Sequence, residues 1–162
     1  MEISKCLSQC VAGRVNLELV NLAQAAEYLN PMRATGESID HEKLVGELSI
    51  ESDLQVHEKL CSHTFRSLCP VTNQPDWASI LVEYRGTKIS RSGLLAYLRG
   101  YAEHDGFHES CVELIYRDIR SLEGIEEVAV CAKFLRRGGI DICPFRTSTI
   151  DFVEPKGRLI RQ

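Results

Sequence analysis

Hydrophobic and polar residues alternate along two segments of the chain, and this alternation is the period of a strand with one buried face. In residues 79–84, the side chains of Ile80, Val82 and Tyr84 share one face and their neighbours take the other. Residues 128–134 repeat the pattern and end at a run of arginines and glycines. The sequence therefore predicts two strands, the first followed at once by a turn.

Three other segments show the 3.6-residue period of an amphipathic helix, with apolar side chains recurring every three or four residues. The first covers residues 53–65, where Asp53 is a good N-cap and Pro70 prevents continuation. The second covers residues 90–101, and the third covers residues 108–121. These patterns place a helix immediately before the loop that contains the proline.

The order of elements from residue 53 is helix, strand, two helices and strand. Such runs favour an α+β domain in which two helices cover one face of an antiparallel sheet. Residues 1–52 are predicted as an N-terminal extension, with a strand over 15–19, a helix over 22–29 and a polar connector over 31–52. Residues 53–162 are predicted as the main domain.

Composition places the chain among globular proteins and argues against several functional classes. Its hydrophobic content is 44% and its charged content is 26%, both ordinary values. The sequence contains no apolar run of membrane-spanning length, and its N-terminus lacks the pattern of a secretion signal. A net charge of −4 gives no general attraction to nucleic acid or anionic lipid. We therefore expect a cytoplasmic protein without direct nucleic-acid binding or membrane contact.

The seven cysteines are odd in number and widely scattered, which argues for reduced thiols in a chain without a secretion signal. His57, Cys61 and His63 carry donor atoms that could hold a metal ion. No second ligand pair stands near them, and such residues are also common on half-buried faces. We therefore expect no metal.

Cys69 is the candidate nucleophile, because a free thiol is a strong nucleophile even when only a few per cent is ionised. Asp76 follows in a polar loop stiffened by two prolines, so both side chains can reach one small substrate. The C-terminal end of a helix disfavours a thiolate through its dipole. The Cys69 thiol is therefore expected to be activated by His63, His108 or the arginines in the C-terminal part of the chain. A structural cysteine followed by an ordinary turn aspartate is the alternative.

A second group of candidate residues stands at the start of the third predicted helix. Glu109 lies in the first helical turn, where it complements the helix dipole. Alternatively, Glu109 accepts paired N–H groups of a planar heterocycle, while Phe107 stacks on the ring and His108 relays a proton. Spacing alone favours the structural explanation.

A third group follows the last predicted strand, where Arg136 and Arg137 precede two glycines. Arginines can clamp a phosphate and glycines allow close approach to a ligand, but an ordinary strand-ending turn has the same composition. Positive charge continues beyond this group, and the cluster either receives a phosphorylated small molecule or forms a solvated tail. Its members are Arg136, Arg137, Arg146, Lys156, Arg158 and Arg161.

Taken together, residues 67–77, 107–113 and 136–148 resemble the NADPH-dependent 7-cyano-7-deazaguanine reductases of queuosine biosynthesis, the QueF family. The motifs occur in the family's order and at reasonable spacing. The resemblance covers roughly residues 50–162 and is strongest to the C-terminal module of the two-module form. It implies the tunnelling fold (T-fold), in which subunits or modules join their sheets into a barrel and form sites at the interfaces.

The resemblance also implies a covalent reaction. Cys69 would add to the nitrile carbon of 7-cyano-7-deazaguanine to give a thioimide, and Asp76 would supply a proton to the nitrogen. Two NADPH molecules in succession would then reduce the nitrile to an aminomethyl group. His108 and Glu109 would hold the deazaguanine. A soft thiolate suits this carbon electrophile, and protonation offsets the charge that develops on nitrogen.

Arg137 and Gly138 would lie against the NADPH, without a Rossmann glycine fingerprint. The family also uses a Glu-Ser-Lys-Ser stretch, which the two-module form carries on its N-terminal module. The nearest counterpart in this chain, Ile89–Gly93, lacks the carboxylate and the lysine. Tyr101-Ala102 also replaces the usual Phe-Arg, and Cys143 replaces the usual Asn.

We therefore expect a homo-oligomer or a complex with a companion N-terminal-type module that supplies the absent stretch. Two alternatives remain open at this level. One is a transferase that forms an amidine from the same nitrile without NADPH. The other is a catalytically silent module that binds a purine-like ligand or a partner subunit.

Overall fold

The computed structural model describes residues 2–20, 36–159 and 162. The chain divides into two compact units, Met1–Asn30 and Pro31–Gln162, and each is described by itself. None of the described helices is both long and apolar enough to cross a membrane.

The Met1–Asn30 unit contains helix α1 (Glu2–Cys10), which the sequence analysis did not predict. Residues 14–20 have no regular structure, so the strand predicted over residues 15–19 is wrong. Ser4 donates a side-chain hydrogen bond to the carbonyl of Val15, and the Val15 N–H donates to the hydroxyl of Ser8. These bonds occupy the main-chain groups that a strand would need for pairing. The helix predicted over residues 22–29 lies outside the described residues.

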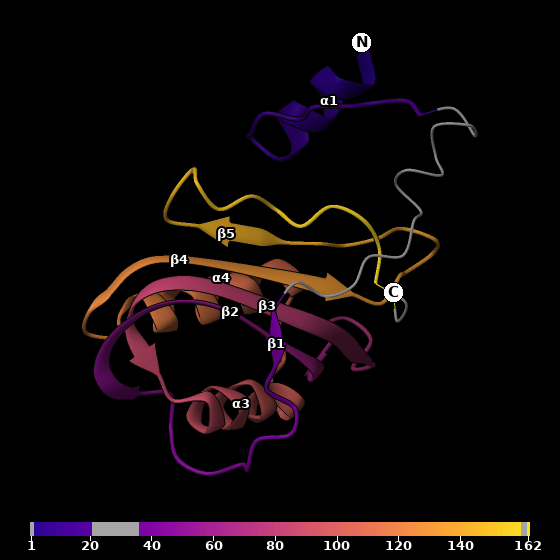
Figure 1. Cartoon of the computed structure of the whole chain (residues 1–162). Helices are drawn as coiled ribbons and strands as arrows, with labels where there is room; N and C mark the ends of the chain where they lie inside the picture. Colours follow the sequence, from indigo (N-terminus) through magenta and orange to yellow (C-terminus); the bar gives the residue numbers. More distant parts are fainter. Residues whose placement is uncertain (1, 21–35, 160–161) are drawn as a thin grey trace. The chain divides into compact units, whose positions relative to one another are not determined.

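The Pro31–Gln162 unit is built on a sheet with strand order β1-β2-β3-β4-β5 (Figure 1). The first pair of strands is parallel and the other pairs are antiparallel. The strands are β1 (Glu37–Ser38), β2 (Ile50–Leu68), β3 (Pro75–Ile89), β4 (Ile125–Phe134) and β5 (Phe145–Thr147).

Strand β2 corrects the helix predicted over residues 53–65. The apolar positions that suggested a helix are spaced by four residues, and a spacing of four also keeps side chains on one face of a strand. Pairing with β3 from Ile50 opposite Ile89 to Leu68 opposite Pro75 settles the structure as a strand.

The register of β2 against β3 shifts between Ser62 and Phe65, where β2 contains one extra residue. The carboxylate of Asp40 supports this bulge by accepting hydrogen bonds from the Ser62 hydroxyl at 2.6 Å and the His63 N–H at 2.8 Å. It also accepts one from the hydroxyl of Thr64 at 3.0 Å. Burial raises the pKa of Asp40, but these hydrogen bonds outweigh burial and the pKa lies below its ordinary value.

Strand β3 contains the predicted residues 79–84 but is longer at both ends. Residues 85–87, predicted as a turn, continue the strand. Gly86 has a φ of 135°, and a Cβ there would lie 2.2 Å from the carbonyl oxygen of Gly124. This glycine therefore serves a close approach of two backbones, and no turn is needed to explain it.

The two helices predicted over residues 90–101 and 108–121 are confirmed as α3 (Arg91–Arg99) and α4 (His108–Arg120), with a short 3₁₀ helix η1 (Gly100–Glu103) after α3. Ser90 caps α3, because its hydroxyl accepts a hydrogen bond from the Gly93 N–H. The strand predicted over residues 128–134 is confirmed within β4.

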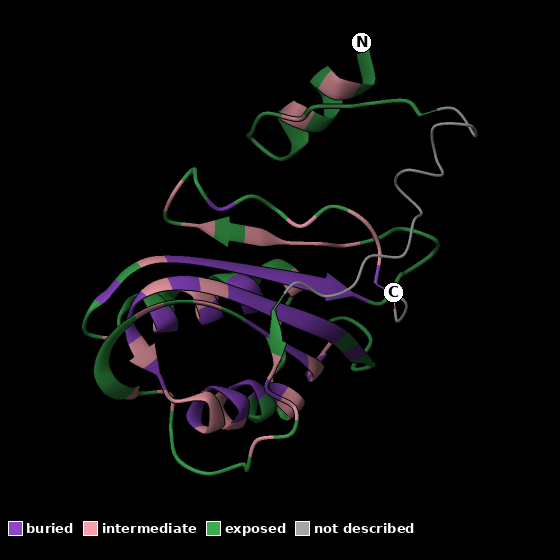
Figure 2. Cartoon of the chain, viewed as in Figure 1, coloured by how far each residue is buried: buried purple, intermediate pink, exposed green. Residues whose placement is uncertain are grey.

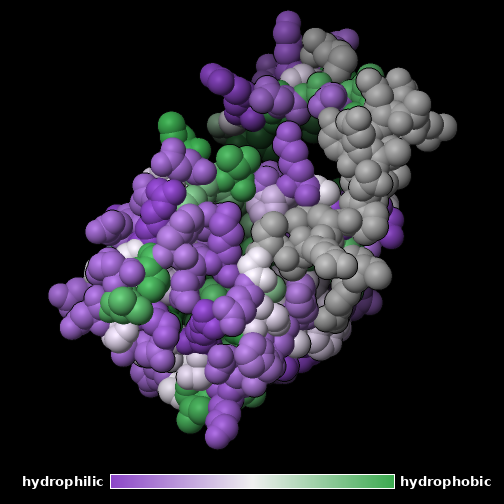
Figure 3. All heavy atoms as spheres, viewed as in Figure 1, coloured by the Kyte–Doolittle hydropathy of each residue, from purple (hydrophilic) through white to green (hydrophobic). Residues whose placement is uncertain are grey.

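Helices α3 and α4 pack on one face of the sheet and enclose the main core, as the α+β prediction requires (Figure 1). Burial follows β3 and β4 along most of their length, whereas the first half of β2 is largely exposed (Figure 2). A smaller apolar cluster of Cys61, Leu81 and Cys131 lies on the opposite face. Over this unit, the surface drawn in Figure 3 is mostly hydrophilic, with apolar residues scattered across it.

Candidate active site

Cys69 stands at the junction of β2 and the loop that leads into β3. Its N–H donates to the carbonyl of Gln74 at 2.9 Å, and its carbonyl accepts from the Asn73 N–H at 2.8 Å. Asn73 adopts a left-handed φ of 56°, which asparagine tolerates better than most residues. The thiol therefore follows a strand and not a helix, so the unfavourable helix dipole expected from the sequence is absent from its position.

The register of the β2–β3 hairpin places Asp76 close to the end of β2 that leads to Cys69. Ser67 pairs directly with Asp76, and both face the side of the sheet that the helices cover, while Cys69 follows the last residue of β2. Phe65 and Ala78, which pair one step earlier on this face, belong to the main core. Cys69 and Asp76 therefore lie near the same end of the β2–β3 pair.

The loop itself favours the ionised form of the half-buried Cys69 thiol. The pKa of Cys69 lies below its ordinary value because the side chain of Thr72 and the backbone N–H groups of Thr72 and Val71 hydrogen-bond the sulfur. The negative charge of Asp76 opposes this effect. The sequence analysis expected histidines or arginines in this role and missed Thr72. A hydroxyl three residues after the cysteine was the available signal.

Asp76 is nearly buried, with 4% of its side chain exposed, and an arginine and a histidine approach its carboxylate. Arg137 donates from Nε to Oδ1 at 3.0 Å and also from Nη2 to Oδ1. The Nε2 atom of His108 lies 3.1 Å from Oδ2. Three residues that the sequence named separately therefore meet at one carboxylate.

His108 begins α4, and its ring packs against Phe134 with the ring centroids 4.0 Å apart. Its Nε2 atom is buried and, within the described part of the chain, makes no hydrogen bond of good geometry. The contact with Asp76 has the distance of an ion pair but not the alignment of a hydrogen bond. This nitrogen is therefore a buried polar atom without a well-aligned partner among the described residues, beside the Asp76 carboxylate.

The other predicted substrate residues lie on the exposed side of the same helix start. Phe107 precedes α4 with 58% of its surface exposed, and Glu109 is exposed in the first turn. None of the described hydrogen bonds or ion pairs joins Glu109 to Cys69 or Asp76. Both side chains are open to a ligand, but the structure does not place them in contact with the thiol.

The late basic cluster is partly neutralised by acidic neighbours. Arg146 pairs with Glu113 at 3.0 Å, and Arg158 pairs with Asp141. Arg161 lies outside the described residues. Arg136, which precedes Arg137, and Lys156 are both exposed.

The residues considered for a metal site do not converge. His57 lies 2.9 Å from a carboxylate oxygen of Glu83, whereas the sulfur of Cys61 lies 3.8 Å from Nε2 of His63. Within residues 2–20 and 36–159, no three side chains of histidine, cysteine, aspartate or glutamate are grouped for a metal.

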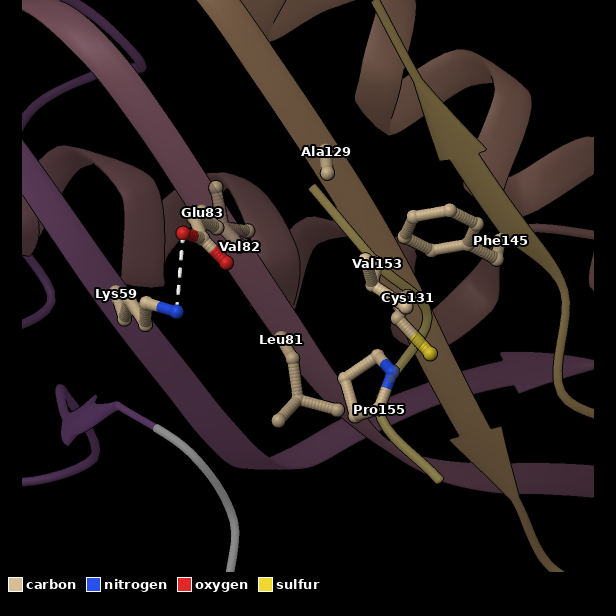
Figure 4. A pocket seen from close by; sticks show the side chains of 9 residues that line it. All are labelled: Lys59, Leu81, Val82, Glu83, Ala129, Cys131, Phe145, Val153 and Pro155. Carbon is tan, nitrogen blue, oxygen red and sulfur yellow. Dashed lines mark ion pairs between the residues drawn. The ribbon is translucent and has the colours of Figure 1, made fainter. Parts of the chain in front are cut away.

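A small cavity lies on the face of the sheet opposite the helices, between the strands and the C-terminal segment (Figure 4). Lys59, Glu83, Cys131, Phe145 and Pro155 contribute to its lining. Its volume of about 20 Å³ has room for about one water molecule. Burial raises the pKa of Cys131 to about 12, so this thiol stays protonated. The cavity is too small for a nucleobase.

Comparison with known proteins agrees with the resemblance seen in the motifs. The family model described as QueF-like protein matches residues 75–151, slightly less than half of the chain. This part of the chain is similar to QueF-like proteins. The match includes Asp76, His108 and Arg137 and begins six residues after Cys69.

The fold is similar to that in the crystal structure of the archaeosine synthase QueF-Like in the apo form. The TM-score is 0.50 at 20% sequence identity, and the alignment covers 58% of this chain and 92% of that chain. An identity this low shows the fold alone. The predicted α+β tunnelling fold is thereby confirmed.

Proposed function

We propose that the chain binds 7-cyano-7-deazaguanine and forms a covalent thioimide through Cys69. The observation that supports this most directly is a thiol with a lowered pKa at the end of the hairpin that also carries the buried Asp76 carboxylate. The similarity to QueF-like proteins over residues 75–151 supports this choice of substrate.

The first step is an addition that conserves all atoms. The Cys69 thiolate donates its electron pair to the nitrile carbon, a C–S bond forms, and the carbon–nitrogen triple bond becomes a double bond. The nitrogen takes one proton, which replaces the one that the thiol lost. The Asp76 carboxylate accepts the proton of the thiol and delivers it to the nitrogen, and His108, 3.1 Å away, can relay protons to Asp76.

We further propose that the thioimide is reduced with NADPH, which supplies a hydride in each of two successive steps when bound. The turn at Gly138 and Gly139 is open to a nucleotide, because a Cβ added at either glycine would meet no atom within 4 Å. A companion module would supply the absent Glu-Ser-Lys-Ser stretch.

A second candidate is the transfer of an amine to the thioimide, which gives an amidine without NADPH. Arg91 stands where the family has its lysine-containing stretch, and its guanidinium is held by Glu37 at 2.8 Å and Glu58 at 2.7 Å. This engagement leaves Arg91 poorly placed to receive a phosphate. The structural relative is also named as an archaeosine synthase and not as a reductase.

The deciding experiment is intact mass spectrometry of the protein mixed with the nitrile in the absence of NADPH. We expect a mass increase equal to one substrate and a new near-ultraviolet band, both lost in Cys69→Ala. Cys143→Ala is the matched control, because Cys143 is also a half-buried free thiol and should leave the adduct intact. Absence of an adduct in the wild type would reject the enzymatic proposal and leave a silent binding module.

The second stage separates the two reactions. NADPH, and then NADPH with a companion module, are added to the preformed adduct. Oxidation of two NADPH per substrate supports reduction. An adduct that leaves NADPH unoxidised but is discharged by ammonia supports the transferase.

A further inference from the structure

The guanidinium of Arg137 contacts three consecutive residues at the start of β3. It donates from Nη1 to the side-chain oxygen of Gln74 at 3.1 Å and from Nη2 to the carbonyl of Pro75 at 3.1 Å. It donates from Nε to Oδ1 of Asp76 at 3.0 Å, and Nη2 reaches the same oxygen. The planar fork of arginine supplies several donors in fixed directions, which a lysine cannot reproduce.

The backbone that carries Arg137 is itself fixed. Arg137 and Ile140 exchange both main-chain hydrogen bonds, at 3.2 and 3.0 Å, across a two-residue turn. The two central residues, Gly138 and Gly139, have φ angles of 59° and 82°, the signs that a type I′ hairpin turn requires. The conformation of the two glycines therefore sets the direction in which the Arg137 side chain leaves the backbone.

This turn is also tied to β3, because the Leu135 N–H donates to the carbonyl of Trp77 at 3.0 Å. The Arg137 side chain thus extends from a hydrogen-bonded hairpin, and this hairpin is attached to Trp77, the residue after Asp76. Its charge meets a carboxylate whose side chain is 4% exposed, while Arg137 itself is 42% exposed. The other side chain that the described residues bring to the Asp76 carboxylate, His108, lacks hydrogen-bond alignment.

From this geometry we propose that Arg137 is a positioning residue for the nucleophile loop, residues 69–76. It holds the Asp76 carboxylate towards the nitrile nitrogen and tethers the end of the loop whose other end carries Cys69. Formation of the Cys69 adduct therefore depends on Arg137 before any cofactor binds. The inference rests on the proposed function for its substrate, and it gives Arg137 a role besides the expected contact with NADPH.

The test measures the rate of thioimide formation against nitrile concentration, without NADPH, in wild type and three variants. Arg137→Gln should lower the limiting rate by about 100-fold and change the half-saturating nitrile concentration little, because misplaced groups chiefly slow the chemical step. Arg137→Lys should recover part of the rate and remain about tenfold slow, since one ammonium cannot bond all three acceptors.

The matched control is Arg136→Gln, which removes the same charge from the neighbouring exposed position and should keep the wild-type rate. A role for Arg137 in NADPH binding alone predicts wild-type adduct rates in all three variants. That result would overturn the proposal. A Lys variant as slow as the Gln variant would also count against it, because it would indicate general damage to the fold.

Two measurements that need no nitrile keep this test separate from that of the proposed function. Trp77, the single tryptophan, follows Asp76 directly, so its emission reports on the tethered segment. Alkylation of Cys69 by iodoacetamide, followed by peptide mapping, reports on the loop at the thiol. Both should change in Arg137→Gln and stay constant in Arg136→Gln, even if the wild type forms no nitrile adduct. If neither measurement changes in Arg137→Gln, the proposed tether is rejected, whatever the nitrile experiment shows.

Discussion

At the scale of single residues, the candidate chemistry depends on the hydrogen bonds that a short loop makes to the sulfur of Cys69. The Cys69 thiol receives hydrogen bonds from Thr72 and from the N–H groups of Val71 and Thr72, which stabilise the thiolate. The other thiols of the helix-covered core and the opposite face differ, because burial raises the pKa of Cys61 and Cys111. Position within the fold therefore lowers the pKa of one thiol and raises the pKa of others.

We expect Thr72→Val to raise the pKa of Cys69, because it removes the hydroxyl that contributes most to lowering it. A higher pKa moves the rise of thiolate with pH to higher pH, so the alkylation rate at pH 7 should fall about 3- to 10-fold. The measurement is the iodoacetamide rate of Cys69 from pH 5 to 10, with peptide mapping.

Val71→Ala is the control for this prediction, since Val71 contributes through its backbone N–H and its side chain is 77% exposed. Its pH profile should overlay that of the wild type. A Thr72→Val profile that also overlays the wild type would show that the hydroxyl does not act on the sulfur.

The motifs revealed the residues of the site but not their contacts. Cys69, Asp76, His108 and Arg137 could each be named from residue type and spacing. The bonds from Arg137 to Asp76 join positions 61 residues apart and depend on the register between strands, which no local pattern encodes. Thr72 was missed for a different reason. A helix wrongly placed before Cys69 directed the search for activating groups towards distant cations.

At the scale of secondary-structure elements, the two helices with signals inside their own segments were predicted correctly. Strand β2, whose structure depends on pairing with another strand, was not. Helix α4 (His108–Arg120) has a strong apolar stripe and α3 (Arg91–Arg99) has a serine cap, and both signals lie within the segment itself. Strand β2 has apolar residues at a spacing that suits either structure. Its identity comes from β3, which lies later in the chain.

Gly86 offers a test of the contact between β3 and the start of β4. We expect Gly86→Ala to lower the free energy of unfolding by about 3 kcal/mol, because the new Cβ would meet the Gly124 carbonyl at a φ of 135°. Gly46→Ala is the control, since Gly46 has a positive φ of 84° but no atom within 4 Å of an added Cβ. It should cost about 1 kcal/mol. Urea unfolding of both variants checks the difference, and equal losses would contradict the steric explanation.

At the scale of the whole Pro31–Gln162 unit, the candidate site and a partly buried polar network around Tyr84 occupy different parts of β3. Tyr84 donates its hydroxyl hydrogen to Glu58 and accepts from the Ile89 N–H, while Arg91 pairs with Glu58 and Glu37. This network joins β1, β2, β3 and α3. Burial raises the pKa of Tyr84, so its hydroxyl stays a donor. Eight residues of strand, roughly 26 Å, separate Tyr84 from Asp76.

We therefore expect Tyr84→Phe to reduce stability without changing the chemistry of the site. Loss of a fully buried hydroxyl that serves two partners should cost about 1 to 3 kcal/mol in the free energy of unfolding. The rate of nitrile adduct formation should remain that of the wild type. The control is Tyr116→Phe, because the Tyr116 hydroxyl makes none of the hydrogen bonds found in the described residues. A slower adduct in Tyr84→Phe would show that the network and the site are coupled.

The bulge in β2 has a consequence for evolution of the site. Before it, even-numbered residues such as Leu60 and Ser62 point towards the helices, and after it the odd-numbered Phe65 and Ser67 do so. One additional residue thus decides which face of the sheet the later odd- and even-numbered residues of β2 occupy. Deleting it would shift the register of β2 against β3 by one residue, so that the residues on one side of the bulge would turn to the other face of the sheet. During evolution, the site therefore constrains the number of residues in β2 as well as their identities.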